Sequence, residues 1–509
     1  MTINTHYKME NSKQEKVMDD KIRDELGFSD FIADDGICDA SYYDSADVIY
    51  VKDFGARGDG IKNDSSAIRK ALTALKHLPK GSTLVFEPDT TYYISSGKFA
   101  VDLKDLDGVN ICGNNTTILV KPIMSFCRIE NCSDVVIKGF TFDYRIKPFV
   151  AADVISANDD GIIRIRTDKS LNIRGTYKQP VADYFGLVDI KDCRCPIGIT
   201  TYKVVNPGEN IYDVKCNNIF KDRDLRITKM KEERYRFIVP MPHVGQVIEQ
   251  AILITGNKNI TMLDCNVCCA AKFMFSVSGN DGFVYFKNLV VGPKDKVNID
   301  IPIIGWRDGF CCRDNRAKII WEDCSVNSLC DDVLNMSASQ LHVQQLGVDL
   351  VSLYLQDSSM PYMDVKVNDE ITFFDSESAE ILEKRTIKSV EIFDSHVEAK
   401  LNSEISKLLN SPSVRAVINN IYMVNSVIKN CDFGGNFSLC TPLYVRESRF
   451  CIRDISTQAK VLLKNQSGKS ILFSNCQLDF EFANDEAVDL ELLEGVVFSD
   501  CEIKKNIQS

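Results

Sequence analysis

The feature that most restricts the fold of this sequence is a dipeptide, Asn or Asp followed by Cys, which closes short hydrophobic runs. Where no insertion intervenes, the unit recurs at roughly 20 to 30 residues; Cys476 and Cys501 are 25 residues apart. Short β-runs at such a period, with turn residues and no helical stripe between them, indicate a solenoid of parallel strands. The runs end at Cys132, Cys265, Cys324, Cys431, Cys476 and Cys501.

Stacked rungs favour interior ladders of small or apolar side chains, because identical positions repeat at about 4.8 Å. Cysteine fits such a ladder as a small hydrophobe, and Asn can bond its amide to the rungs above and below. The sequence therefore predicts an all-β fold, a right-handed parallel β-helix. A β-sandwich with irregular strands does not explain the recurring dipeptide.

A single amphipathic helix is predicted near the start of the solenoid. A strand at 48–50 and a Gly-rich turn at 53–64 precede a segment with apolar residues at helical spacing, from Ala67 to Leu75. Asp64 is placed to act as the N-cap, and Pro79 with Gly81 to end the helix. We expect this helix to cover the open first rung.

Two segments depart from the rung pattern and alternate polar with apolar residues, which is typical of antiparallel hairpins with one wet face. We interpret them as two small inserted antiparallel β domains. The predicted organisation is an acidic polar leader (1–45), N-terminal rungs with the capping helix (46–149), a first insertion (150–248), central rungs with the candidate site (249–344), a second insertion (345–415) and C-terminal rungs (416–505).

Charge and cysteine content narrow the choice of partner. The 509 residues carry a net charge of -12, so no basic surface for nucleic acid or anionic lipid is expected, and no run approaches the roughly 18 apolar residues of a membrane span. The 19 cysteines suit reduced thiols, because zinc-ligand spacings are missing; we expect neither metal nor cofactor. The leader lacks the pattern of a secretory signal, which predicts a cytoplasmic protein, or a secreted one if a signal has been removed. The sequence leaves open whether the protein forms a homo-oligomer.

Acidic residues gather between 305 and 337, inside the central rungs. Asp308 and Asp331 are 23 residues apart, about one rung, so we expect them to stack on neighbouring strands and to face one cleft. Asp332 can reach the same cleft only if the chain bends there. Clustered carboxylates yield a protonated acid beside an ionised base, which is the pairing that glycoside hydrolysis requires. Calcium ligation, or a merely solvated turn, is the alternative.

The turn at 53–64 and the helix after it resemble the signature of the pectin-lyase-like β-helix superfamily. This helix, the FDY motif at 142–144, the two insertions, a DG pair and the CDDVLN segment at 330–335 together resemble glycoside hydrolase family 110. The resemblance implies an inverting, metal-independent exo-α-galactosidase that releases terminal α-1,3-linked galactose. The resemblance also implies that Asp331 is the general acid, and that Asp308 and Asp332 hold and deprotonate the attacking water. At two positions where members of that family carry His, this chain has Cys311 and Ser337. This difference affects which glycosidic linkage we expect the protein to recognise.

Five further residues are candidates for binding sugar. Trp306 and Trp321 flank the acid cluster and could stack on a sugar face, although tryptophan is more often core. Arg307 and Arg313 could bond hydroxyls or orient a carboxylate, or be merely solvated. Asp143 of the FDY motif could bind sugar across the groove or end a rung.

Two other functions fit the same predicted fold. One is a polysaccharide lyase or polygalacturonase-type enzyme that acts on pectin. The other is a non-catalytic β-helix that binds glycans. Each of these functions is compatible with the predicted solenoid, so the fold alone does not distinguish them.

Overall fold

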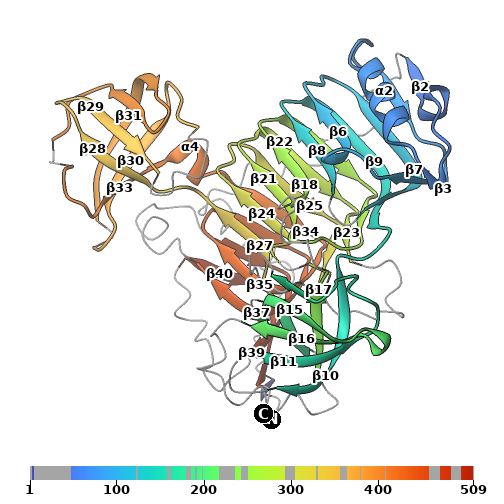
Figure 1. Cartoon of the computed structure of the whole chain (residues 1–509). Helices are drawn as coiled ribbons and strands as arrows, with labels where there is room; N and C mark the ends of the chain where they lie inside the picture. Colours follow the sequence, from blue (N-terminus) through green and yellow to red (C-terminus); the bar gives the residue numbers. More distant parts are fainter. Residues whose placement is uncertain are drawn as a thin grey trace.

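The structure, a computed structural model, is a stack of parallel strands with two antiparallel parts beside it (Figure 1). It describes residues 3–4 and 47–507, apart from 122–123, 158–161, 179–184, 190–191, 198, 217–234, 242–249, 293–303, 306, 328, 330, 356–363, 379, 407–408, 458–470 and 483–494. The predicted fold class is confirmed: a parallel β-helix with an N-terminal helix and two antiparallel β insertions.

Each rung contributes strands to three parallel sheets, which we number in the order the chain visits them. Sheet 1 contains β6 (Phe99–Lys104), β8 (Ser125–Glu130), β18 (Gln250–Thr255), β21 (Phe273–Ser278), β24 (Phe310–Arg313), β27 (Asp332–Ser337) and the ends of β35 (Asp432–Leu439) and β37 (Arg449–Ser456).

Sheet 2 runs the length of the solenoid. It contains β2 (Val48–Tyr50), β4 (Thr83–Val85), β7 (Asn110–Val120), β9 (Ser133–Tyr144), β19 (Lys258–Leu263), β22 (Asp281–Lys287), β25 (Lys318–Glu322), β34 (Ser426–Lys429), β36 (Leu443–Arg446), β38 (Ile471–Ser474) and β40 (Val496–Ser499).

Sheet 3 closes each rung and shares the long strands β7, β9, β35 and β37 with the other sheets. Its remaining strands are β3 (Asp59–Asn63), β5 (Thr91–Ile94), β20 (Asn266–Val267), β23 (Val290–Val291), β26 (Ser325–Val326), β39 (Gln477–Phe482) and β41 (Glu502–Ile507).

The recurring dipeptide has a physical explanation at the corners of the rungs. Its Asn or Asp adopts the left-handed conformation, with φ of 52° at Asp264 and 51° at Asn430, which short polar side chains tolerate best. The cysteine that follows then points inward and is buried, and the amide of Cys324 donates to the Cys431 sulfur of the next rung at 3.3 Å. The 14 cysteines whose side chains the structure describes are free thiols.

The expected amide ladder exists, but other residues make it. At the corner between sheets 1 and 2, Asn257 donates to Asn280 and Asn280 donates to Asn315, each at 2.9 Å and each buried. Asn430 of the dipeptide instead lies at the corner between sheets 2 and 3, where it donates to Asp323 at 2.7 Å. The prediction named the right interaction at the wrong corner.

The capping helix α2 (Ser65–Leu75) buries Ala67, Ile68, Ala71, Leu72 and Leu75 against the first rungs. It ends before Pro79, as predicted. Asp64 is the N-cap residue, as predicted, but its side chain makes no cap bond; its carboxylate accepts instead from the amides of Arg57 and Gly58 in the preceding turn. A short 3-10 helix, η3 (Val51–Phe54), leads into that turn.

The first insertion is an eight-stranded antiparallel sheet. From one edge of the sheet to the other, its strands are β12 (Thr176–Lys178), β15 (Ile199–Asn206), β16 (Ile211–Cys216), β11 (Ile162–Thr167), β10 (Phe149–Ala157), β17 (Tyr235–Pro240), β13 (Phe185–Asp189) and β14 (Asp192–Ile197), with η4 (Pro207–Glu209) between β15 and β16 along the chain.

The second insertion is a closed antiparallel barrel followed by a helical turn, α4 (Asn419–Tyr422). Its strands, in order, are β28 (Leu341–Gln345), β29 (Leu350–Tyr354), β32 (Val397–Leu401), β31 (Ile381–Ile392), β30 (Glu370–Asp375) and β33 (Val414–Ile418). The exact segment limits drawn from the sequence stay a prediction.

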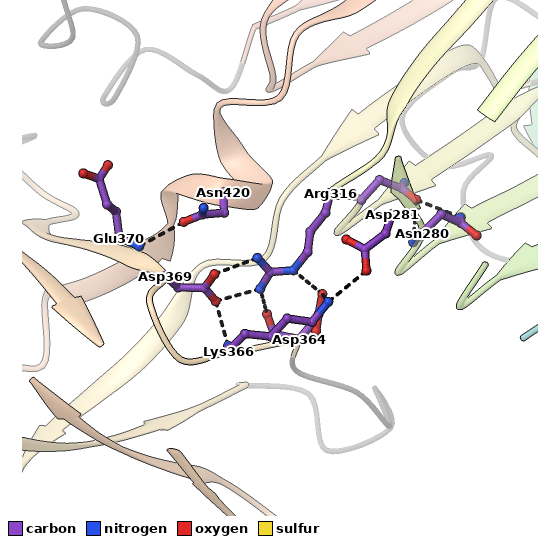
Figure 2. Close-up of polar contacts among 9 residues, drawn as sticks. Asn280, Asp281, Arg316, Asp364, Lys366, Asp369, Glu370 and Asn420 are labelled. Atoms are coloured by element: carbon purple, nitrogen blue, oxygen red, sulfur yellow. Dashed lines mark hydrogen bonds and ion pairs between the residues drawn. The ribbon is translucent and has the colours of Figure 1, made fainter. Parts of the chain in front are cut away.

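A buried ion cluster joins the barrel to the solenoid (Figure 2). Arg316, just before β25, donates to both carboxylate oxygens of Asp369 at 2.7 Å and to the carboxylate of Asp364. All three side chains are at most 9% exposed. Lys366 extends the cluster to Asp281 of β22 at 3.0 Å. The barrel is thereby fixed to the central rungs.

Two residues of the predicted leader form β1 (Ile3–Asn4), which pairs antiparallel with β41 on the last rung. The other leader residues, up to 46, lie outside the described part. No described helix is long and apolar enough to cross a membrane.

Candidate active site

The acid cluster lies at the turn that leads from sheet 3 into sheet 1. Asp308 precedes β24, and Asp332 opens β27 on the next rung. Phe310 pairs with Leu334, an offset of 24 residues, and a second bridge on the N-terminal side keeps that offset. Asp308 therefore lies opposite Asp332, and the predicted pairing with Asp331 is wrong by one residue. The ladder hydrogen bonds fix the register, and a mean rung length does not determine it.

The chain bends at Asp331, immediately before β27 begins at Asp332. This bend is the condition under which two consecutive aspartates can face one cleft, and it confirms that expectation. One carboxylate oxygen from each of Asp308, Asp331 and Asp332 lies within 4.8 Å of the other two. The structure thus brings the three predicted catalytic residues together.

Asp308 is the most deeply buried of the three, at 4% exposed. Burial, and then the charges of Asp331 and Asp332, raise its pKa to about 7. Arg307 and a hydrogen bond from Cys311 oppose that rise. Cys311, which stands where the resemblance expects His, therefore contacts the Asp308 carboxylate. Burial raises the pKa of the Cys311 thiol to about 12, so this thiol stays protonated and can donate to the Asp308 carboxylate.

Asp332 and Asp331 differ in their surroundings. Burial, followed by Asp331 and Asp454, raises the pKa of Asp332 to about 7. Burial also raises the pKa of Asp331, but Arg307, whose guanidinium lies 3.7 Å from the carboxylate, opposes it. Asp331 is more accessible than Asp308, with 30% of its side chain exposed. The cluster thus contains carboxyl groups that hold protons near neutral pH.

Two polar residues continue the cluster toward the C-terminal rungs and were missed from the sequence. Asn436 pairs with Asp332, and Asp454 pairs with Asn436, so the three form one column across the rungs. The second insertion separates Asp332 from Asn436 in sequence, which hides their pairing. The only sequence signal was Asp454 itself, because it falls at a rung corner.

The predicted sugar-binding residues have different positions. Arg307 lies at the cluster, half-buried, and Arg313 lies at the end of β24. Asp143 is held by Lys147 and by the amide of Tyr144 at 2.7 Å, at the end of β9.

The two tryptophans do not form the expected pair of stacking platforms. Trp321 is fully buried in the solenoid core, where its ring packs on Phe286 and Phe310. Its predicted role in sugar stacking is wrong, because position 321 on β25 points inward between outward-facing neighbours. Trp306 lies outside the described residues.

Chemically, the cluster can do two things. Its carboxyl groups can donate and accept protons around a bond placed between them, because the pKa values of Asp308 and Asp332 are raised to about 7. The same three groups, Asp308, Asp331 and Asp332, offer oxygens close enough together to hold a hard divalent cation. Occupancy by a proton and occupancy by a cation compete for the same oxygens.

Comparisons with known proteins find one matching family model and several similar structures. A family model described as rhamnogalacturonase A/epimerase, pectate lyase-like, matches residues 48–133. The polygalacturonase structure from Erwinia carotovora is similar over 91% of this chain and 96% of its own, with 11% identity and a TM-score of 0.37. The resemblance to the pectin-lyase-like superfamily, inferred from 53–64 and the helix, is confirmed.

Two curated relatives match over short segments. α-1,3-Galactosidase B of Bacteroides thetaiotaomicron is 28% identical over 138 residues, which are 24% of this chain and 22% of that protein. The non-secreted LysM effector LysM19 of Penicillium expansum is 30% identical over 127 residues, 25% of this chain and 8% of that protein. The matches span less than a quarter of either relative, so they carry a likeness and no activity.

Proposed function

We propose that this protein is a glycoside hydrolase that releases terminal α-linked galactose, with Asp308, Asp331 and Asp332 as its catalytic residues. The observation that carries the proposal is the cluster itself: three aspartates from two adjacent rungs with oxygens within 4.8 Å, two of them with a pKa of about 7. The likeness to an α-1,3-galactosidase supports the choice of sugar.

The register favours a division of labour. Asp308 and Asp332 lie opposite each other, so like-charge repulsion makes the pair share a proton and leaves one ionised member to hold and deprotonate a water. Asp331 is more accessible than Asp308 and lies outside that pair, so it takes the role of protonating the glycosidic oxygen. Arg307 then stabilises the Asp331 carboxylate that forms when the proton leaves. Water adds to the sugar as the leaving group departs with the proton of Asp331.

The stereochemical course needs its own measurement. Inverting glycosidases keep about 6.5–9.5 Å between their two carboxyl groups and retaining ones about 5–5.5 Å. The nearest oxygens of this cluster lie within 4.8 Å, below the inverting range. Inversion is part of the proposal because the family resemblance implies it. Nuclear magnetic resonance of the first-formed galactose decides: initial β-galactose from an α-galactoside supports inversion, and initial α-galactose contradicts it.

The decisive experiment is a hydrolysis panel with p-nitrophenyl-α-galactoside and unmodified Gal-α-1,3-Gal. We expect the wild-type protein to release galactose from both substrates, and Asp308→Asn and Asp331→Asn to lose activity on Gal-α-1,3-Gal while remaining folded. Asp323→Asn is the matched control, since Asp323 is an exposed corner residue of the same segment. Full activity of either catalytic variant on Gal-α-1,3-Gal contradicts the residue assignment. Binding of glycans without any release would favour a non-catalytic β-helix.

A pectinolytic enzyme is the second candidate, because the matched family model describes a rhamnogalacturonase and epimerase group. Such an enzyme binds anionic sugars, whereas this cluster is built from carboxylates with Arg307 already paired. Incubation with polygalacturonic acid tests it. New reducing ends would indicate a hydrolase, and ultraviolet-absorbing unsaturated ends would indicate a lyase.

A further inference from the structure

An apolar stripe runs along the outer face of sheet 2, away from the acid cluster. It crosses six consecutive strands, β22 to β40, and each member pairs with the next. Their strand neighbours on both sides point into the solenoid core, so these side chains point outward. We call this the outer stripe; its members are Tyr285, Ile320, Val427, Tyr444, Leu472 and Val497.

The outer stripe is buried although it faces away from the core. Tyr444 is 3% exposed and Leu472 is fully buried. The outer face of a solenoid sheet meets solvent unless something covers it, and a covered apolar stripe of this length indicates a packed partner segment. The described residues of the stripe belong to a cluster separate from the interior core.

A basic column lies directly beside the outer stripe, two residues further along each strand. Lys287, Glu322, Lys429 and Arg446 stack on successive rungs. Glu322 pairs with both lysines, at 3.6 and 3.4 Å, so the column holds three cations and one carboxylate. The Nε of Arg446 is buried, and no described residue accepts a hydrogen bond from it. The face is therefore suited to an acidic, partly apolar segment.

The path of the chain supplies such a segment. Residues 3–4 pair with β41 on the last rung, and the carbonyl of Asp47, next to β2, accepts from Thr83 on the first rungs. Sheet 2 spans ten strand-to-strand steps between these ends, about 48 Å at roughly 4.8 Å per step. The 42 residues from 5 to 46 reach up to about 140 Å when extended, so they connect the two ends with length to spare. Figure 1 shows β2 at one end of the stack and β40 toward the other.

The composition of that segment matches the face. Residues 1–45 carry eleven acidic and five basic side chains, and a set of large apolar residues is interspersed between 17 and 32. This set comprises Val17, Met18, Ile22, Leu26, Phe28, Phe31 and Ile32.

We propose that residues 5–46 cover the outer stripe, with their apolar side chains on the stripe and their acidic ones toward the basic column. The leader is then an intramolecular partner of sheet 2. This inference is independent of the galactosidase proposal, since the outer stripe and the acid cluster lie on different faces.

Hydroxyl-radical footprinting of the full-length protein tests the contact. We expect weak labelling of Tyr444 in the wild type. The double variant Ile22→Asp, Leu26→Asp should raise that labelling about tenfold, because exposure would move from 3% toward the 39% of Tyr50. The double variant Ile146→Asp, Ile155→Asp is the control, since it adds the same charge at exposed sites, and it should leave Tyr444 unlabelled.

Three outcomes overturn the proposal. Strong labelling of Tyr444 in the wild type would show that nothing covers the stripe. Protection that persists in the folded leader variant would show that something other than residues 5–46 covers it. If the leader variant fails to fold, photo-crosslinking decides: Phe283, partly buried beside the stripe, is replaced by p-benzoylphenylalanine. Crosslinks to peptides from 5–46 of the same chain support the proposal, and crosslinks between two chains, or none, contradict it.

Discussion

The Asp308→Asn substitution should make the protein more stable at neutral pH while it removes activity. Asp308 is 4% exposed, and its pKa is raised from 3.8 to about 7, mainly by burial. An ionised carboxylate in that position costs free energy that the unfolded chain is spared, since there the group is solvated. Asparagine has the same shape and no charge, so it keeps the packing and removes the cost.

The size and sign of the effect follow from the pKa shift. Below about pH 4 the carboxyl of Asp308 is protonated in both the folded and the unfolded chain, so its full contribution to stability is present. Between about pH 4 and pH 7 the unfolded chain loses the proton and the folded one keeps it. The free energy of unfolding therefore falls by about 1.4 kcal/mol per pH unit. From pH 4.5 to pH 7.5 the loss is about 3 kcal/mol for this group.

Urea unfolding of the wild type and of Asp308→Asn at pH 4.5 and at pH 7.5 measures this difference. We expect the variant to gain about 3 kcal/mol relative to the wild type between the two pH values. Asp323→Asn, at an exposed corner, should follow the wild type at both. If Asp308→Asn shows the same pH dependence as the wild type, Asp308 ionises normally in the folded protein, and its role in a proton-sharing pair is wrong.

Four further outcomes are expected. Asp331→Asn should lower kcat on Gal-α-1,3-Gal by about 10²–10⁴-fold with little change in KM, and far less on p-nitrophenyl-α-galactoside, whose leaving group needs no proton; equal losses on both would contradict an acid role. In kcat/KM against pH, the ascending limb should move to lower pH in Asp332→Asn, because Asp308 loses a like-charged neighbour and its pKa falls; an unmoved limb would rule out the pair. Dialysis against EDTA should leave hydrolysis unchanged, whereas a loss restored by Ca²⁺ would identify the cluster as a metal site. Arg316→Met should cost about 3–5 kcal/mol in urea unfolding, because it removes the buried cation that pairs with both Asp364 and Asp369. Lys366→Met, at a half-exposed position, should cost under about 1 kcal/mol.

The sequence predicted the fold well because the solenoid repeats its local constraints. At the corner, a left-handed backbone conformation favours Asn or Asp, and the buried position that follows favours Cys. The same dipeptide therefore recurs from rung to rung. The amide ladder was assigned to the wrong asparagines because both kinds of corner carry Asn. Only the structure shows that Asn280 turns inward and Asn430 outward.

The sequence predicted which aspartates form the candidate site, but it did not predict which of them lie opposite each other on adjacent strands. Residue types and a spacing near one rung were enough to group Asp308 with Asp331 and Asp332, but a one-residue difference in rung length exchanges which aspartate lies opposite Asp308. Trp321 shows the same limit on one strand. Its neighbours Ile320 and Glu322 point outward, so its inward position follows from pairing and cannot be read from proximity to the acid cluster.

In the proposed mechanism, the register gives each of the three acids a different part in catalysis. Two carboxyl groups held opposite each other on adjacent rungs cannot both ionise cheaply, and the backbone hydrogen bond from Gly309 to the Asp332 carbonyl, at 2.8 Å, keeps them from moving apart. The bend frees Asp331 from that column and places it beside Arg307, where its ionised form is stabilised. A regular strand at 331 would turn this carboxylate away from the other two. The bend before β27 is therefore what converts a ladder of like charges into a proton-sharing pair with a separate acid.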